Sequence, residues 1–271
     1  AGQYREDFSA TSWNSQGMFC KDLAKHRSKC EYICRMAGQH DVTMLEEIHG
    51  DDGTYEAWQR PRTHEAFFSH GPSYGVAGVG MLVKKEFLKK FSSHRWVEIW
   101  RGHAAKLELR GAAGSLDLWV AYFHTGARVQ PADLDGVLPG ARRTCTSFAA
   151  IRSHMRSRIA KALAPRRLVL SVIVGDFNWC AERDGRRTLA TMRISVFRDL
   201  HEERHWLQLL EPLGFYEAQQ MEFTHRSAAA CIRLDRIYLN QHASEQLDRE
   251  LFVGALDWQR DLSHHRAITI S

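Results

Sequence analysis

The segment at residues 168–178 reads Leu-Val-Leu-Ser-Val-Ile-Val-Gly-Asp-Phe-Asn. Its first seven residues are almost all apolar, and a short run of this kind, rich in β-branched residues, is typical of a buried strand. Gly175 ends the run, and Asp176 and Asn178 follow it closely. We therefore predict a buried strand whose end presents an acid and an amide.

Four other fragments carry polar side chains, each at a predicted strand end. Near the end of the sequence, Ser263-His264-His265-Arg266 offers imidazoles that could face the carboxylate of Asp176. The remaining fragments are Ser12-Trp13-Asn14, Leu45-Glu46-Glu47 and Arg233-Leu234-Asp235. We expect these side chains to converge at one edge of the fold.

The composition is that of a globular protein. Of 271 residues, 44% are hydrophobic and 25% are charged, which argues against a disordered chain. No repeat or linker divides the chain, and its polar fragments extend from Asn14 to His265. We therefore predict a single domain over residues 1–271.

The sequence also bears on the location of the protein. It shows no apolar run near the ~20 residues that span a bilayer, and its first nine residues lack the layout of a secretory signal. We expect a soluble intracellular protein, nuclear or cytoplasmic, with reduced cysteines and no membrane partner. Because the chain begins with Ala1, we expect a processed protein or a piece of a longer polyprotein.

Many short strand patterns alternate with a few helical ones. This mixture favours two packed sheets with helices outside over one doubly wound parallel sheet. Strands are predicted at residues 8–13, 42–45, 78–83, 96–100, 105–109, 116–123, 168–174, 232–239 and 267–270, and helices at 17–37, 142–163 and 197–210.

The predicted helix at residues 142–163 lies in a basic stretch. Residues 141–167 include eight Lys or Arg and no acid. A basic outer face that binds nucleic acid is one interpretation, and a solvated helix face is the other. The candidate contacts are Arg142, Arg143, Arg152 and Arg156.

Cysteine and histidine spacing raises one further alternative. Cys30 and Cys34 lie one helical turn apart, and His26 lies one turn earlier, so a zinc site is conceivable. No second Cys/His pair at ligand spacing completes a tetrahedral set. Buried thiols on a helix face are therefore the favoured interpretation.

The polar fragments match the needs of phosphodiester hydrolysis. That reaction needs a divalent cation, a group that deprotonates water, and donors for developing negative charge. Mg²⁺ prefers oxygen ligands, so carboxylates and amides are expected around it. Glu47 is suited to be such a ligand, and Asn14 could lie beside it.

Taken in order, the five fragments resemble the endonuclease/exonuclease/phosphatase superfamily, which includes pancreatic deoxyribonuclease and the apurinic/apyrimidinic endonucleases. The resemblance implies an α/β fold, a four-layer sandwich of two packed mixed sheets flanked by helices. It also implies a Mg²⁺- or Mn²⁺-dependent phosphodiesterase.

The resemblance assigns a role to each matching residue. Asn14 and Glu47 match the metal site, and Glu46 occupies the family's usual Gln position. Asp176 and Asn178 match the pair that orients water and holds the phosphate.

The remaining matches concern histidines. Asp235 matches the acid that hydrogen-bonds the catalytic imidazole, which is His265. His124 matches a position near the leaving group, with Tyr122 as the alternative. The family's Ser-Asp-His ending reads Ser-His-His here, so His264 stands where an Asp is expected in the metal site.

A finer resemblance narrows the expected substrate. Phe223-Thr224-His225 and the following Arg233-Leu234-Asp235-Arg236-Ile237-Tyr238 resemble the endonuclease domains of non-LTR retrotransposons. We therefore expect a DNA endonuclease that leaves 3′-hydroxyl and 5′-phosphate ends. The alternatives are an RNA 3′ exonuclease, a small-molecule phosphatase, and a nucleic-acid-binding module made inactive by His264.

Overall fold

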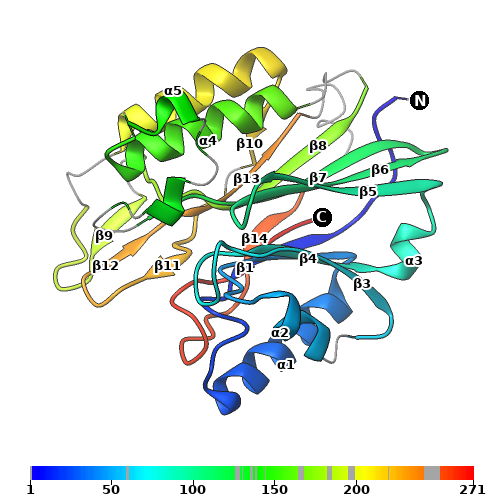
Figure 1. The fold of residues 1–271 in the computed structure, drawn as a ribbon, viewed down its shortest axis with the longest axis horizontal. Helices are drawn as coiled ribbons and strands as arrows, with labels where there is room; N and C mark the ends of the chain where they lie inside the picture. Colours follow the sequence, from blue (N-terminus) through cyan, green and yellow to red (C-terminus); the bar gives the residue numbers. More distant parts are fainter. Residues whose placement is uncertain are drawn as a thin grey trace.

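Two six-stranded sheets pack face to face, and helices cover their outer faces (Figure 1). The computed structural model describes residues 2–58, 61–125, 129, 131–134, 137, 139–143, 145–163, 168–181, 185–194, 199–218, 220–240 and 251–271. This architecture confirms the predicted four-layer α/β sandwich.

The first sheet has the strand order β14-β15-β1-β2-β4-β3. The strands β1 and β2 are parallel, and the other pairs are antiparallel. The bounds are β1 Ala10–Asn14, β2 Val42–Glu46, β3 His64–Ser69, β4 Val79–Lys84, β14 Val253–Ala255 and β15 Ile268–Ile270.

The second sheet has the strand order β10-β13-β8-β7-β6-β5. Only β7 and β8 are parallel. The bounds are β5 Ser93–Trp100, β6 Ala104–Gly111, β7 Gly114–Tyr122, β8 Leu170–Asp176, β10 Tyr216–Glu217 and β13 Asp235–Leu239. A small third sheet joins β9 Arg186–Thr188, β11 His225–Arg226 and β12 Ala230–Ile232.

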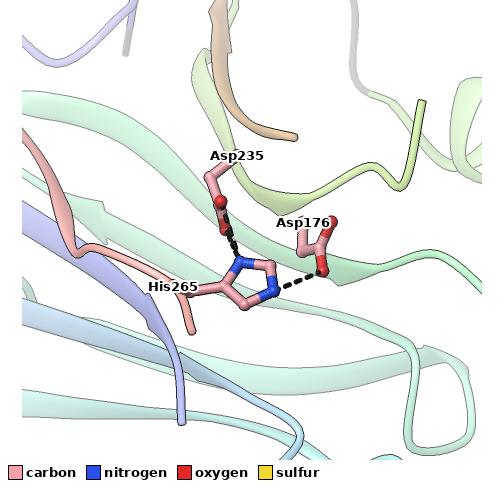
Figure 2. Close-up of side chains that lie close together, drawn as sticks. All are labelled: Asp176, Asp235 and His265. Atoms are coloured by element: carbon pink, nitrogen blue, oxygen red, sulfur yellow. Dashed lines mark hydrogen bonds and ion pairs between the residues drawn. The ribbon is translucent and has the colours of Figure 1, made fainter. Parts of the chain in front are cut away.

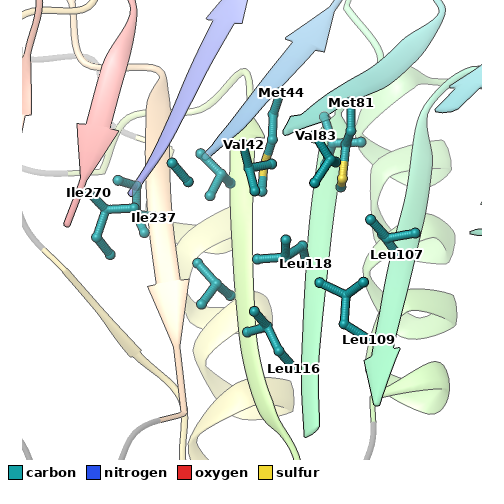
Figure 3. Close-up of a cluster of buried hydrophobic side chains, with 14 of the residues drawn as sticks. Val42, Met44, Met81, Val83, Leu107, Leu109, Leu116, Leu118, Ile237 and Ile270 are labelled. Atoms are coloured by element: carbon teal, nitrogen blue, oxygen red, sulfur yellow. The ribbon is translucent and has the colours of Figure 1, made fainter. Parts of the chain in front are cut away.

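The main core lies between the two large sheets (Figure 3). Val42, Met44 and Met81 project from the first sheet, and Leu107 and Leu118 project from the second. All five side chains are fully buried. Their burial on both sides holds the strand ends of the two sheets in a fixed relation, because close-packed side chains tolerate little displacement.

Three longer helices cover the outer faces (Figure 1). Helix α1, Leu23–Gln39, covers the first sheet, and α4, Phe148–Ala162, and α5, Leu200–Leu210, cover the second. The short helices are α2 Asp52–Ala57 and α3 Lys85–Leu88, with 3-10 turns at Pro131–Leu134, Pro139–Ala141 and Glu211–Leu213. None of the helices in the described ranges has the length and apolar character of a membrane span.

Helix starts differ from the predictions because capping side chains set them. Asp22 accepts a hydrogen bond from the Lys25 backbone, so α1 begins at residue 23 and not at 17. Ser147 caps α4 in the same way, so this helix begins at residue 148 and not at 142. Of the helix predicted at 197–210, residues 197–198 lie outside the described residues.

Each predicted strand overlaps an observed strand, with one division. The predicted strand at 232–239 is two strands: β12 pairs with β9 in the small sheet, and β13 pairs with β8 in the second sheet. The backbone leaves strand geometry at Arg233 and Leu234, where the carbonyl of Leu234 accepts from the Phe177 amide. Five strands of the described residues were not predicted: β3, whose segment His-Glu-Ala-Phe-Phe-Ser lacks a clear alternation, and the very short β9, β10, β11 and β14.

The prediction of a basic outer face on α4 is wrong for two of its arginines. Arg156 is buried, and Arg152 is half-buried. Both guanidinium groups pair with the carboxylate of Glu202 on α5, which holds the two helices together. Arg142 and Arg143 are exposed and precede the helix.

Candidate active site

The polar strand ends converge where the two sheets meet. In the second sheet, Asp235 at the start of β13 lies directly opposite Asp176 at the end of β8. In the first sheet, Asn14 at the end of β1 lies opposite Glu46, and Glu47 follows. The parallel and antiparallel registers thus bring four fragments, distant in sequence, to the same edge.

Gly175 makes this arrangement possible. Its backbone has φ +151°, and a Cβ at this position would lie 1.8 Å from the carbonyl oxygen of Ala121 on β7. Only glycine permits so close an approach of β8 to β7. The next residue, Asp176, is therefore held against the end of β7.

His265 lies between two carboxylates (Figure 2). Its Nδ1 donates to Asp235, at 3.0 Å from Oδ2 and 3.3 Å from Oδ1. Its Nε2 lies 3.8 Å from Oδ2 of Asp176. All three side chains are buried, so these charges interact in a medium of low polarity.

The backbone around His265 is also fixed. The hydroxyl of Ser263 accepts from the His265 amide at 3.0 Å and donates to the carbonyl of Asn14 at 2.7 Å. The indole of Trp13 donates to the His265 carbonyl at 3.2 Å. The segment that carries the imidazole is therefore tied to β1.

Asn14 links the carboxylates of the two sheets. Its amide nitrogen donates to Oε1 of Glu47 at 2.8 Å and to Oδ2 of Asp176 at 3.0 Å. Its amide oxygen accepts from the Gln16 backbone at 3.1 Å. This orientation places Asn14 beside both carboxylates, and a role as a direct metal ligand stays a prediction.

Burial and neighbouring charge perturb Asp176 and His265 strongly. Burial raises the pKa of Asp176 to about 7, although the positive charge of His265 opposes the shift. Burial acts to lower the pKa of His265, but Asp235 and Asp176 outweigh it and raise that pKa to about 9. Asp176 is thus poised to exchange a proton near neutral pH, and His265 carries a positive charge there.

The carboxyl groups of the neighbouring Glu46 and Glu47 have pKa values shifted in opposite directions. Burial raises the pKa of Glu46 well above its usual value, and its carboxyl accepts from the Ser12 hydroxyl. Burial also acts on Glu47, but hydrogen bonds from His49 and Asn14 lower the pKa of its carboxyl. Glu47 therefore remains an anion, as a cation ligand must.

The donor set fits a hard divalent cation. Glu47 and Asp176 offer carboxylate oxygens on either side of the Asn14 amide, and Mg²⁺ and Mn²⁺ favour such oxygens. Asp176, Asp235 and His265 also form a group whose potential ligand atoms all lie within 4.8 Å of one another. Both nitrogens of His265 face carboxylates, and the role of Glu47 as a metal ligand stays a prediction.

Asn178 and His264 occupy the borders of the site. The Asn178 backbone amide donates to Oδ1 of Asp176 at 3.0 Å, and its side chain donates to the Phe123 carbonyl at 2.7 Å. The backbone amide of His264 donates to the Gln16 side chain at 2.9 Å. The His264 side chain is exposed, and its metal role stays a prediction.

His124 is buried at the end of β7 beside the site. Arg152 donates to its backbone carbonyl at 2.9 Å. Burial, with smaller effects from His103 and Arg152, lowers the pKa of His124 to about 2. This ring is therefore neutral at physiological pH. Tyr122, the alternative, lies two residues earlier and opposite Asp176 in the sheet register.

Three histidines near the site were not predicted. The ring of His225 lies 4.7 Å from that of His265, His49 contacts Glu47 at 3.3 Å, and His103 stacks on His124. With 15 histidines in the chain, spacing alone does not distinguish these three from the others. Within the described residues, Cys30, Cys34 and His26 do not form a metal-binding group.

Comparisons with known proteins identify the family and the fold. The profile of the endonuclease/exonuclease/phosphatase family matches residues 11–255. Among solved structures, AP endonuclease LMAP from Leishmania major has a TM-score of 0.69 at 13% identity and covers 97% of this chain and 86% of its own. No curated protein sequence matches significantly.

Two structures of TDP2 from D. rerio are also similar. A humanized form with 14 mutations has a TM-score of 0.58 at 15% identity, and a complex with single strand DNA product has a TM-score of 0.57 at 14% identity. Each alignment covers 97% of both chains. At these identities the structural likeness bears on the fold alone.

Proposed function

Because the chain belongs to the endonuclease/exonuclease/phosphatase family, whose members are metal-dependent hydrolases of phosphate esters, we propose that it is a DNA endonuclease. In this proposal it hydrolyses a phosphodiester by in-line attack of water and leaves 3′-hydroxyl and 5′-phosphate ends. The observation that carries the proposal is the buried contact of His265 with Asp235 and Asp176 beside the Asn14–Glu47 pair.

Asp176 is the proposed general base. A base works best when its pKa lies near the working pH, and burial brings Asp176 into that range. Its Oδ1 accepts from the Asn178 backbone amide and its Oδ2 from the Asn14 side chain, so the carboxylate is held in place to accept the proton of the attacking water. Asn178, turned by its positive φ of 56°, orients the water and the phosphate.

His265 is the proposed electrostatic partner of the phosphate. Its imidazolium, held by Asp235, offers a positive N–H group where negative charge develops on oxygen. A bound Mg²⁺ or Mn²⁺ supplies further charge neutralisation at the phosphate. Glu47 would hold this ion, with Asn14 and His264 at its sides.

DNA is the proposed substrate for three reasons. The net charge is +5, one similar structure is an AP endonuclease, and another is a complex with single strand DNA product. The retrotransposon-like fragments favour a nicking enzyme.

We also propose an intracellular location, nuclear or cytoplasmic, because all six cysteines are free thiols.

A substrate panel tests the proposal. Supercoiled plasmid, poly(A) and a phosphoinositide are incubated with the protein in Mg²⁺ and in Mn²⁺. We expect nicked plasmid with ligatable 3′-hydroxyl and 5′-phosphate ends and little turnover of the others. Preferred cleavage of poly(A) or of the phosphoinositide contradicts a DNA endonuclease, and binding without cleavage in either metal supports an inactive nucleic-acid-binding module.

A further inference from the structure

Four aromatic rings form a column beside the active site. The His103 ring lies 5.4 Å from that of Tyr122 with an interplanar angle of 8°. The same ring lies 3.6 Å from the ring of His124 with an interplanar angle of 15°. The ring of Phe148 on α4 also stacks with that of His124, at 6.2 Å and 27°. His103 thus stacks with both alternatives for the position near the leaving group, Tyr122 and His124.

His103 itself is rigidly held. It lies in the turn between β5 and β6, and its Nδ1 donates to the Tyr122 carbonyl at 2.9 Å. Its backbone carbonyl accepts from the Tyr122 amide at 2.7 Å. Because the carbonyl of Tyr122 can only accept, the Nδ1 proton is fixed and the ring cannot turn without losing this bond.

The His124 ring is held differently. Its Nδ1 is buried and has no hydrogen-bond partner among the described residues. Arg152 fixes only its backbone carbonyl. The orientation of this imidazole therefore depends on ring contacts, and the contact with His103 at 3.6 Å is the tightest of them.

We propose that His103 is a positioning residue that holds the His124 imidazole at the angle at which it can donate a hydrogen bond to the phosphate or the leaving oxygen. This inference rests on the proposed function and adds a residue that no family motif assigns here. It also fixes the chemistry of His124, which acts as a neutral donor and not as a general acid.

The charges around the column agree with neutral rings. Two imidazoles stacked this closely repel each other when both are protonated. Burial lowers the pKa of His103 to about 4, although Glu47 opposes the shift. His124 also faces Arg152, whose charge is balanced by Glu202 from α5. Neither ring is expected to gain a proton in the working pH range.

Three substitutions separate the two contacts of His103. His103→Phe keeps a ring for stacking, His103→Gln keeps a donor for the Tyr122 carbonyl, and His103→Ala removes both. We expect His103→Ala and His103→Gln to lower kcat roughly 10- to 100-fold with KM changed less than about threefold, since a small misplacement costs turnover on this scale. His103→Phe should stay within about fivefold of the wild-type kcat.

His64 is a matched control. It is equally buried, and its ring contacts the Ala37 carbonyl at 3.0 Å, but it lies on β3 away from the site. His64→Ala should lose stability with unchanged kcat. A wild-type kcat in His103→Gln, or a His103→Ala variant that loses only stability as His64→Ala does, overturns the inference.

An NMR measurement tests the same role without activity. The mobility of the His124 ring, measured by nuclear relaxation of its ring atoms, should increase in His103→Ala but not in His103→Phe, because only alanine removes the ring that stacks on His124. An unchanged mobility of the His124 ring in His103→Ala overturns the inference. If the wild-type protein cleaves no DNA, the proposed function fails, and this NMR result still decides the role of His103.

Discussion

His265 shows how position changes the chemistry of one side chain. In water an imidazole is half protonated near pH 6.5. Here Asp235 and Asp176 face its two nitrogens, and their negative charge keeps it protonated to higher pH. The same contacts leave Asp176 buried beside a cation, with Asn14 holding its Oδ2. The site thus gives Asp176 the properties of a base and His265 those of a cation through their positions alone.

This charge arrangement predicts a pH dependence of stability. The pKa of His265 is raised in the folded protein, so the stabilisation that its proton provides is complete below about pH 6.5. It is lost as pH rises through about 9. Thermal melting of the metal-free protein from pH 6 to 10 should show a loss on the order of 1–3 kcal/mol. The loss should be much smaller in Asp235→Asn, and an equal loss in both proteins would contradict this account.

His264 gives a second prediction at this scale. An imidazole in place of the family's carboxylate removes negative charge and offers nitrogen, which Mn²⁺ accepts better than Mg²⁺ does. The wild-type protein should therefore be more active in Mn²⁺, and His264→Asp should raise the Mg²⁺ rate. His201→Asp, on the exposed side of α5, controls for the added charge. An unchanged metal preference in His264→Asp would place His264 outside the metal site.

At the scale of elements, helix α4 fixes the segment that carries His124. Its Arg152 connects Glu202 of α5 to the carbonyl of His124, and Arg156 completes the pair with Glu202. A basic sequence stretch thus includes two arginines that serve packing. The exposed arginines of the stretch remain candidates for contact with phosphate.

The arginines should therefore separate into two classes. Arg143→Ala should leave the fold intact and lower the salt slope of DNA binding by about 0.9 if it contacts one phosphate. Arg152→Ala should leave that slope unchanged and cost about 1.5–3 kcal/mol of stability, the usual range for hydrogen bonds to a charged group. Fluorescence binding titrations across salt concentrations and denaturant melts measure both. A lower salt slope in Arg152→Ala would restore the outer-face interpretation.

Strand β8 depends on a glycine in a comparable way. Gly175→Ala would force a Cβ against the carbonyl of Ala121, so β8 must move away from β7 and carry Asp176 with it. We expect a loss of about 1–3 kcal/mol, the scale of overpacking. Gly38→Ala is the control, because its Cβ meets nothing within 4 Å in α1 and should stabilise by about 0.5–1 kcal/mol. Equal effects at both positions in denaturant melts would contradict this explanation.

At the scale of the whole molecule, the sequence predicts the layers of the fold better than it predicts which side chains contact one another in the site. Buried strands such as β7 and β8 are rich in apolar residues, so their positions follow from the pattern. Asn14, Asp176 and Asp235 lie at predicted strand ends. The family resemblance then assigns a role to each of them. The sequence pattern does not show that β12 and β13 are separate strands, because the separation depends on the pairing of β12 with β9, which is distant in sequence.

The same limit explains the missed side chains. His103 becomes important only because β6 and β7 bring it against His124, and nothing in its own segment marks it. The sequence predicts Arg156 on the surface, but in the fold it is buried and paired with Glu202 of α5. Tertiary contacts of this kind override local pattern, whereas strand periodicity and motif order do not depend on them.

The central claim is that Asp176 activates water in a DNA endonuclease. The direct measurement is the single-turnover rate of plasmid nicking in Mn²⁺ for the wild-type protein, Asp176→Asn and Asp117→Asn. Asp117 is an equally buried acid on β7 that pairs with Arg110, so its variant controls for the loss of a buried carboxylate. We predict that Asp176→Asn nicks at least about 100-fold more slowly while folded Asp117→Asn nicks at the wild-type rate. A wild-type rate in Asp176→Asn would contradict the account.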